Sequence, residues 1–530
     1  MTTLILFILV LWIVCCNLIA ELKRDLMMMQ QNSYRTERYM RWLRTSGDTT
    51  SVVRLVGMCV FLIALVVFAD PRWAMGIMAA FAGGSFISLI SKKYKKPLVW
   101  TPRAKRIYAV SAVLSVVVVS FSLFMAEDSA ESRLFVASVA ATGLYCASHM
   151  VIIAAVWILR PVERRINHSY YADAERILRS MPSLKIIGIT GSYGKTSTKH
   201  YLHRILSEEY SVTMTPGSYN TTMGVIRTVR EYLKPYDEIF IVEMGAKQPG
   251  DIREICDLVH PQMAIITAVG EQHLESFKTI ENVQRTKFEL VDSLPSDGFA
   301  VINNDFPYIA SREVANVAAV RYAVSAPDGA TWRATDIEYS ADGTDFTAEG
   351  PGVSLRLHTR LVGECNISNL LACVVMAIHI GVPEQKIKLA VADIRQVEHR
   401  LNVKRTPGGI TIIDDAFNSN PTGSSMALDV LAGMTSGQRI IITPGMIELG
   451  DRQEELNRQF GRRIASCADI AIIVGQYNRA AITSGIAEGG MPDSRVKIAD
   501  TFSHAQLILA EIARSGDTVL YENDLPDTFK

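Results

Sequence analysis

The chain has 530 residues, more than one ordinary domain needs, which indicates two to four domains. Lysine plus arginine and aspartate plus glutamate each total 54, so the net charge gives no information about a polyanionic partner. The mean hydropathy of +0.17 averages two unlike parts, since apolar residues crowd the first 160 positions and the rest resembles an ordinary soluble α/β protein. The eight cysteines form no C-x-x-C pair, which argues against a disulfide framework and fits a reducing compartment.

Five apolar segments predict membrane-spanning helices, at residues 3–20, 52–69, 73–90, 107–125 and 134–159. Each is close to the ~20 apolar residues that a bilayer-crossing helix needs. The second and third are separated by so few residues that a re-entrant hairpin is the alternative. The first segment lacks a basic start and a small-residue cleavage site, so we interpret it as an anchor and not as a signal peptide.

The loops between these segments predict an orientation. Residues 21–51 and 91–106 are rich in lysine and arginine, whereas residues 127–131 are acidic. Basic loops favour the cytoplasmic side, which places the amino terminus outside and everything after Arg160 inside. We therefore expect a multi-pass protein of a bacterial inner (cytoplasmic) membrane with its soluble part in the cytoplasm. Apart from His149, the segments hold almost no ionisable residue, which favours an anchor or lipid-docking platform over a transport path.

The predicted domain order is a membrane domain at 1–160, an amphipathic connector helix at 161–182, a central domain at 183–403 and a carboxy-terminal domain at 404–530. Strands alternate with helices in the last two. From residue 404 the predicted strands are 410–413, 439–443, 470–474 and 518–520, an alternation typical of a doubly wound, Rossmann-like domain. The predicted fold class is thus an α-helical transmembrane region followed by α/β domains, the central one with a phosphate loop and a mostly parallel sheet.

A glycine-rich turn joins the predicted strand at 185–190 to a predicted helix from about residue 196. The turn and its flank are Gly191, Ser192, Tyr193, Gly194, Lys195, Thr196 and Ser197. A strand–loop–helix context is what a phosphate-binding loop requires, with glycines for close backbone approach, Lys195 to neutralise phosphate charge and Thr196 to ligate Mg²⁺. The alternative is a glycine-rich turn with a surface lysine.

Further motifs follow this loop in a fixed order. They are Pro216–Val225, Glu243–Ala246, Gly270–Phe277, Thr286–Glu289, Val301–Asp305, Gly363–Asn369, His399–Leu401 and Ile413–Pro421. Together with the loop, they resemble the Mur ligase family, most closely the branch that adds D-alanyl-D-alanine to the muramoyl tripeptide. The resemblance covers about residues 183–460 and is far more specific than any one motif.

The resemblance implies ATP and Mg²⁺ as cofactors. The residues it assigns to ATP are the loop Gly191–Ser197, Asn369, Arg400 and Asp414. Those it assigns to the metal are Thr196, Glu243, His273 and Lys287, the last carbamylated. The implied catalytic residues are Lys195, Lys287 and His273, and the implied substrate contacts are Asn220, Thr221, Thr222, Asn418 and Asn420. For the single asparagines, an Asx-rich turn is the alternative.

The implied reaction is an ATP-dependent amide-bond ligation through an acyl phosphate. The partners would be a membrane, a muramoyl-peptide or lipid-linked envelope precursor, and an amino acid or dipeptide as amine donor, with no nucleic acid. Two departures leave the substrate open. The membrane segments stand where the family has its UDP-binding domain, and residues 521–527 are acidic where a basic element is usual. The alternatives are a membrane-bound poly-amino-acid capsule ligase, an ATP-driven transporter or signalling ATPase, and an inactive scaffold.

Overall fold

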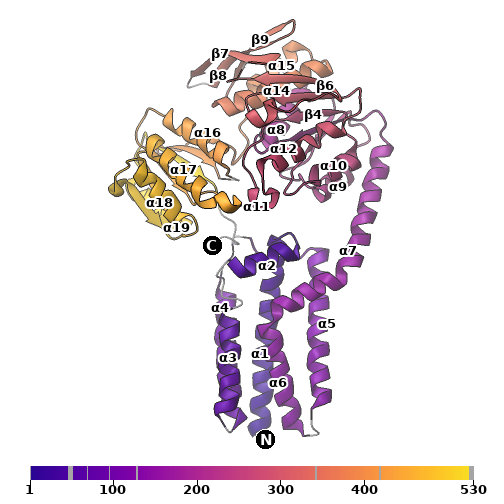
Figure 1. Ribbon diagram of the computed structural model, residues 1–530, viewed down its shortest axis with the longest axis vertical. Helices are drawn as coiled ribbons and strands as arrows, with labels where there is room; N and C mark the ends of the chain where they lie inside the picture. The colour runs from indigo at the N-terminus through magenta and orange to yellow at the C-terminus, as the bar shows by residue number, and fades with distance from the viewer. Residues whose placement is uncertain are drawn as a thin grey trace. The chain divides into compact units, whose positions relative to one another are not determined.

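The computed structural model describes residues 2–45, 52–68, 70–92, 94, 96–126, 129–326, 328–340, 343–416 and 419–524 (Figure 1). The chain forms two compact units, a helical one up to Asn167 and an α/β one from His168 to Asp524. Asn418, one of the predicted substrate residues, lies outside the described residues.

The helical unit consists of apolar helices with well-formed starts. Its helices are α1 (Thr2–Gln31), α2 (Thr36–Thr45), α3 (Val52–Val67), α4 (Pro71–Ser91), α5 (Pro102–Met125), α6 (Ala130–Cys146) and α7 (Ser148–Arg179). Asp70, Thr101 and Ser129 cap the amino termini of α4, α5 and α6 by accepting a backbone N–H. Helix α1 packs against α4, α5 and α6 (Figure 1), so the first predicted segment is the centre of this unit.

Fewer helices than the predicted five are long and apolar enough to cross a membrane. Among the described residues there are three, at 3–31, 72–91 and 102–125, or up to four if the α6–α7 pair, bent by 76°, is one span. The difference arises because α3 has only 16 residues and because the predicted span at 134–159 is broken at Ala147. Helix α7 then continues to Arg179 through Pro161, so it contains most of the predicted connector.

A nine-stranded sheet forms the core of the first part of the α/β unit. Its strands are β1 (Lys185–Thr190), β2 (Val212–Met214), β3 (Ile239–Glu243), β4 (Met263–Ile266), β5 (Phe299–Asn303), β6 (Ala318–Ala323), β7 (Trp332–Ser340), β8 (Gly343–Gly350) and β9 (Val353–Thr359). The order is β2-β3-β1-β4-β5-β6-β7-β8-β9, parallel as far as β7 and antiparallel beyond it. The predicted mostly parallel sheet is confirmed.

Helices cover both faces of this sheet, because its central strands are apolar on both sides. The helices are α8 (Lys195–Leu206), α9 (Thr222–Glu231), α10 (Asp251–Val259), α11 (Leu274–Phe277), α12 (Ile280–Phe288), α13 (Pro307–Ala310), α14 (Glu364–Ile380) and α15 (Glu384–Asp393). Ile187 and Ile189 of β1 pack with α8 and α14, whereas Ile186 packs with the cluster that includes α9, α10 and α12. The carboxyl ends of β1, β3 and β4 therefore lie side by side at one edge.

A second, six-stranded sheet follows. Its strands are β10 (Asn402–Arg405), β11 (Thr411–Asp415), β12 (Arg439–Thr443), β13 (Ile470–Val474), β14 (Val496–Ala499) and β15 (Thr518–Glu522). The order is β10-β11-β15-β12-β13-β14, with only β10–β11 antiparallel among the described pairs. Its helices are α16 (Pro421–Ala432), α17 (Gln453–Cys467), α18 (Arg479–Glu488) and α19 (Phe502–Ile512). All four predicted strands are present, and the first strand of this sheet in the chain is β10.

Candidate functional site

The phosphate loop lies between β1 and α8, where two glycines are required by space. A Cβ at Gly191 would lie 2.0 Å from Oγ1 of Thr267, and the backbone N–H of Ala268 is also close. Gly194 has φ +80°, and a Cβ there would lie 2.5 Å from Oδ1 of Asn369. Neither position accepts a side chain without displacing its neighbours, so the two glycines allow the loop to pack closely against Thr267 and Asn369.

Lys195 lies over the loop that precedes it. Its ammonium donates to the carbonyl oxygens of Gly191 at 2.7 Å and Ser192 at 3.3 Å. Burial lowers the pKa of Lys195 to about 8, with Glu243 opposing the shift and Arg400 adding to it. A partly desolvated cation beside free backbone N–H groups is suited to bind phosphate oxygens.

Glu243 brings the ends of several elements together. Its carboxylate, at the end of β3, accepts from Thr196 Oγ1 at 3.2 Å, Asn220 Nδ2 at 3.0 Å and Lys199 Nζ at 3.1 Å. Burial tends to raise the pKa of Glu243, but the charges of Lys199 and Lys195 outweigh it, so the pKa is lowered. The side chain is thus held ionised although it is only 1% exposed.

Lys199 was not predicted from the sequence, yet it is the closest cation to Glu243. Its side chain is fully buried, and its ammonium also donates to the carbonyl oxygen of Gly217 at 2.6 Å. One signal was available: Lys199 follows Lys195 by four residues, which places both on the same face of α8.

Thr196 and Glu243 are a suitable start for a Mg²⁺ site. Both offer hard oxygen atoms, and Mg²⁺ in nucleotide sites is commonly held by one or two protein groups together with phosphates and water. Within the described part of the chain, no three His, Cys, Asp or Glu residues group as metal ligands. Two protein oxygens therefore fit a metal that the nucleotide would help to hold, whereas an all-protein cage is not formed by these residues.

Among the hydrogen bonds and ion pairs of the described residues, neither His273 nor Lys287, the two other predicted metal residues, contacts Thr196 or Glu243. Nδ1 of His273 is paired with the carboxylate of Glu448, which comes from the second sheet domain. Burial lowers the pKa of His273 and outweighs the raising effect of Glu448. Lys287, on α12, is 2% exposed, and burial holds its pKa well below the usual range, with Lys195 adding to the effect. The structure thus assembles Thr196 with Glu243 and does not add His273 to them.

The residues predicted to face ATP lie around the loop. Oδ1 of Asn369 accepts from Thr198 Oγ1 at 3.1 Å, so α14 supports the first turn of α8. The guanidinium of Arg400 reaches Thr196 Oγ1 at 3.5 Å. The carboxylate of Asp414 lies 2.8 Å from Nδ1 of His399, which lines the same cavity as Thr196 and Arg400.

The predicted substrate residues divide into two kinds. Asn220 contacts Glu243 directly and so belongs to the site. Thr221 and Asn420 instead cap helices, by accepting from the N–H groups of Gly224 at 3.3 Å and Gly423 at 2.9 Å. The side chain of Asn420 is thus used in a turn, which is the alternative that its sequence context left open.

A cavity of about 700 Å³ opens beside Thr196. One wall is α8, with His200, His203 and Arg204, and the other is the segment at 393–400, with Arg395 and Arg400. Burial lowers the pKa of His200 to about 4, with Lys199 adding to the shift, so this histidine carries no charge at pH 7. The carboxylates of Asp393 and Glu398 also line the cavity, and Arg204 pairs with Asp393 at 3.2 Å, so the lining is of mixed charge.

The acidic end of the chain is partly buried in the second sheet. Glu522, at the end of β15, accepts from Ser419 Oγ at 2.7 Å and Ser424 Oγ at 2.9 Å, while its other oxygen has no hydrogen-bond partner among the described residues. Burial raises the pKa of Glu522 well above its usual range, with the adjacent Asp415 adding to the shift. Burial here therefore favours the neutral form of this carboxyl over its charged form.

Comparison with known proteins identifies both α/β domains. Residues 189–377 match the Mur ligase middle domain, and residues 399–521 match the Mur ligase glutamate ligase domain. UDP-N-acetylmuramoyl-tripeptide–D-alanyl-D-alanine ligase of Escherichia coli K12 is 31% identical over 320 residues, which is 59% of this chain and 69% of that protein. The enzyme of the same name from Bacillus subtilis is 26% identical over 342 residues, or 64% and 72% of the two chains.

Solved structures agree with these matches. MurF from Thermotoga maritima in complex with ADP has a TM-score of 0.61 at 25% identity, covering 67% of this chain and 80% of that one. MurF from Acinetobacter baumannii has a TM-score of 0.60 at 26% identity, covering 66% and 76%. Both family matches begin after residue 188, so the helical unit is outside them.

Proposed function

This chain belongs to the Mur ligase family, whose members are ATP-dependent, ADP-forming ligases, and from that premise we propose that it joins an amino acid or dipeptide to the carboxylate of a cell-envelope precursor. The first candidate for the acceptor is a muramoyl peptide, because the relatives carry that substrate in their names. A lipid-linked form of such a precursor is the second candidate, because the chain carries apolar helices ahead of its ligase domains.

The observation that carries the proposal is the group formed by Lys195, Thr196, Lys199 and Glu243 at the phosphate loop. ATP bound with its phosphates over the loop would meet the Lys195 ammonium and the N–H groups at the start of α8. Thr196 and Glu243 would hold Mg²⁺, which neutralises phosphate charge when it is bound. The site offers positive charge and oriented dipoles, which is what phosphoryl transfer needs from a protein.

The reaction proposed has two steps. An oxygen of the acceptor carboxylate attacks the γ-phosphorus of ATP, the bond to the β-γ bridging oxygen breaks, and ADP leaves. The amine then attacks the acyl carbon, loses a proton, and expels inorganic phosphate as the amide forms. The cavity beside Thr196 would hold the acceptor, because it adjoins the loop and because Arg400 in its wall offers positive charge to a carboxylate.

We further propose that Lys287 is carbamylated. A lysine amine must be neutral to add CO₂, and burial of Lys287 favours the neutral form. The carbamate would replace the buried amine with an anionic oxygen group, for which the nearby charge of Lys195 would be favourable. Lys287→Ala should lose activity that acetate or formate restores in part, whereas activity unaffected by the change would contradict the carbamate.

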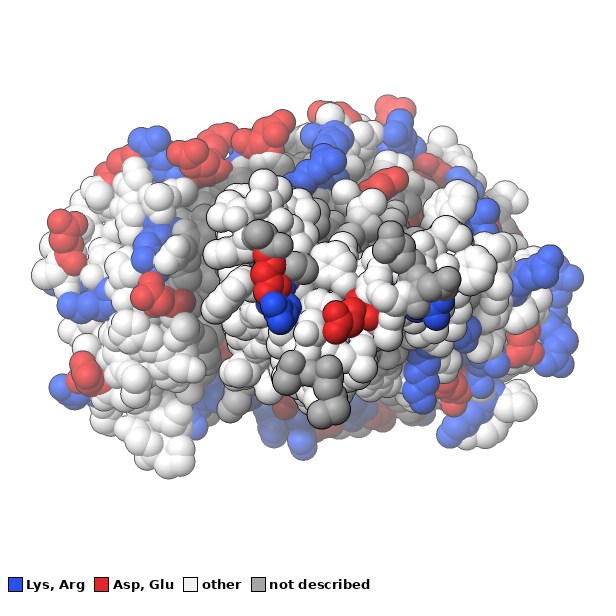
Figure 2. All heavy atoms as spheres, turned by 90° about the horizontal axis from the view of Figure 1, so that it is seen from below, with Lys and Arg blue, Asp and Glu red and all other residues white. Residues whose placement is uncertain are grey.

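The helical unit is proposed to anchor the enzyme in a bacterial inner membrane, with the ligase domains in the cytoplasm. Helices α1, α4 and α5 have the length and composition of membrane spans. Large apolar side chains such as Trp12, Phe124 and Trp157 are 64%, 80% and 71% exposed, and lipid would cover them. Figure 2, which views the protein from below, shows mostly white surface in the region nearest the viewer, with a few charged side chains among the residues that are not grey.

The direct test is acceptor-dependent turnover by the full chain in detergent or nanodiscs. With ATP, Mg²⁺, D-alanyl-D-alanine or single amino acids, and muramoyl-peptide acceptors in soluble and lipid-linked forms, we expect release of ADP and phosphate only when an acceptor is present. Lys195→Ala should abolish this release, whereas Lys388→Ala, which removes an exposed lysine on α15, should not. A rate of ATP hydrolysis that is the same with and without each acceptor would overturn the ligase proposal and favour an ATPase.

A further inference from the structure

A second cavity, of about 340 Å³, lies in the helical unit where α1 and α4 lose their apolar character. Its basic lining residues are Lys23, Arg24 and Lys92, and its apolar ones include Met27, Leu89 and Leu98. No acidic side chain is among its lining residues in the described part of the chain. The pocket therefore combines positive charge with an apolar wall.

The outer wall of this pocket is held in place by α1. Gln30 pairs with the backbone of Val99, donating to its carbonyl oxygen at 2.8 Å and accepting from its N–H at 2.9 Å. Gln31 donates to the carbonyl oxygen of Lys96 at 2.9 Å. These hydrogen bonds hold the segment with Pro97 and Leu98 against the end of α1, so the position of this wall does not depend on side-chain packing alone.

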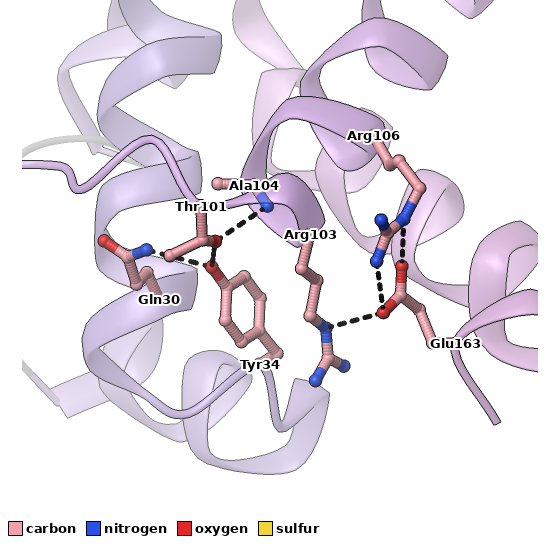
Figure 3. A network of polar contacts seen from close by, with 7 residues as sticks. All are labelled: Gln30, Tyr34, Thr101, Arg103, Ala104, Arg106 and Glu163. Atoms are coloured by element: carbon pink, nitrogen blue, oxygen red, sulfur yellow. Dashed lines mark hydrogen bonds and ion pairs between the residues drawn. The ribbon is translucent and has the colours of Figure 1, made fainter. Parts of the chain in front are cut away.

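A polar network continues this attachment toward α5 and α7 (Figure 3). Gln30 donates to the hydroxyl of Tyr34 at 3.0 Å, and that hydroxyl lies 3.5 Å from Oγ1 of Thr101, the amino-terminal cap of α5. One turn later, Arg106 forms two hydrogen bonds with Glu163 of α7, at 2.7 and 3.0 Å. Figure 3 shows the side chains of Arg103 and Arg106 directed at the same carboxylate, so three helices are joined at the level of the pocket.

The position of the pocket along the helices matches the headgroup region of a membrane. Helix α1 is apolar up to Ala20, and Lys23 follows three residues later; α4 ends at Ser91, directly before Lys92. Trp100 and Tyr108 form an edge-on pair, with ring centres 5.3 Å apart, at the start of α5. Tryptophan and tyrosine are enriched at membrane–water interfaces, and basic pockets between helices on the cytoplasmic side bind anionic lipid headgroups.

We propose that this pocket binds the phosphate of an anionic membrane lipid. Lys23, Arg24 and Lys92 contact the phosphate oxygens, and Met27, Leu89 and Leu98 contact the first carbons of the lipid chain. Glu21, 3.7 Å from the Arg24 guanidinium, orients that arginine at the pocket wall. The inference rests on the proposed membrane insertion of the helical unit.

The test is native mass spectrometry of the full chain in detergent, titrated with phosphatidylglycerol or phosphatidylcholine. We expect a retained phosphatidylglycerol and weaker retention of the zwitterionic lipid. The double variant K23Q/K92Q should bind phosphatidylglycerol about thirtyfold more weakly, since each basic residue near the surface contributes ~1 kcal/mol to binding of anionic lipid. The matched control K105Q/R165Q removes the same charge from exposed positions on α5 and α7 and should bind as the parent does.

The outcomes separate this proposal from the anchor proposal. Equal losses in the pocket variant and in the control would overturn the pocket, as would equal retention of the two lipids by the parent chain. Displacement of the lipid by millimolar inorganic phosphate would assign the site to free phosphate and overturn the lipid assignment. Extraction of the chain from vesicles by alkaline carbonate, measured separately, would overturn membrane insertion itself.

Discussion

Replacing Lys199 with methionine tests the electrostatic core of the site. The Lys199 ammonium lies 3.1 Å from the Glu243 carboxylate, and both side chains are almost completely buried. Methionine keeps the length and apolar body of the side chain while it removes the charge and the hydrogen bond to Gly217. The carboxylate would then be buried with one cation fewer, since Lys199 is the charge that most lowers its pKa.

The expected loss of unfolding free energy is about 3–5 kcal/mol, the range found when one partner of a buried ion pair is removed. The double variant K199M/E243Q removes both charges, and a neutral amide in place of the carboxylate can still accept from Thr196 and Asn220 donors. It should therefore lose less than the sum of the single variants, with a coupling of roughly 0.5–3 kcal/mol. Lys199→Met should also raise the pKa of Glu243 and shift the acidic limb of the pH–turnover profile upward.

Pulse proteolysis of the full chain in detergent over a urea series would measure these free energies. The matched control is Lys388→Met, which changes an exposed lysine on α15 and should stay within about 0.5 kcal/mol of the parent. Strict additivity of the two single variants would refute the reasoning, and so would a loss below 1 kcal/mol for Lys199→Met.

Three further predictions concern the loop and the second sheet. Gly194→Ala should weaken ATP binding at least tenfold in calorimetry, because the added methyl group would meet Asn369. The control is Gly250→Ala: Gly250 also has a left-handed backbone but has open space around it, so this variant should bind ATP as the parent does. ATP binding should weaken by up to about tenfold between pH 7 and 9, since Lys195 has a pKa of about 8 and binds phosphate when it is protonated. The variant Lys195→Arg should show no such change, because an arginine stays protonated over this range. Glu522→Gln should stabilise the protein, and more so at pH 8 than at pH 5. Because folding raises the pKa of Glu522, the folded protein binds more protons than the unfolded chain above about pH 4. The glutamate therefore lowers the free energy of unfolding as the pH rises, whereas a glutamine at this position does not. Urea midpoints that favour the variant less at pH 8 than at pH 5 would contradict this argument.

The order of strands and helices around the loop could be predicted from local patterns. Strand β1 lies at 185–190 as predicted, and α8 begins at Lys195, one residue from the prediction. The four predicted strands of the second domain are also present. Such segments are short apolar runs bounded by glycine and by helix starts, and these signals act within a few residues of the chain.

Features that depend on distant contacts could not be predicted in this way. The bend between α6 and α7 comes at Ala147, within an apolar run that carries no proline or glycine at the break. The pairing of His273 with Glu448 joins residues 175 positions apart.

The sequence alone located the candidate phosphate loop, because its glycines, lysine and threonine lie within eight consecutive residues between a strand and a helix. Family membership could also be inferred from the order of the motifs, and the comparisons confirm it. Only the tertiary structure decided which charges meet there: β1 and β3 are neighbours in the sheet, so Glu243 lies against Thr196 and Lys199. The same is true of the basic pocket in the helical unit, since Lys23 and Lys92 are 69 positions apart in the chain and become neighbours only through the packing of α1 on α4.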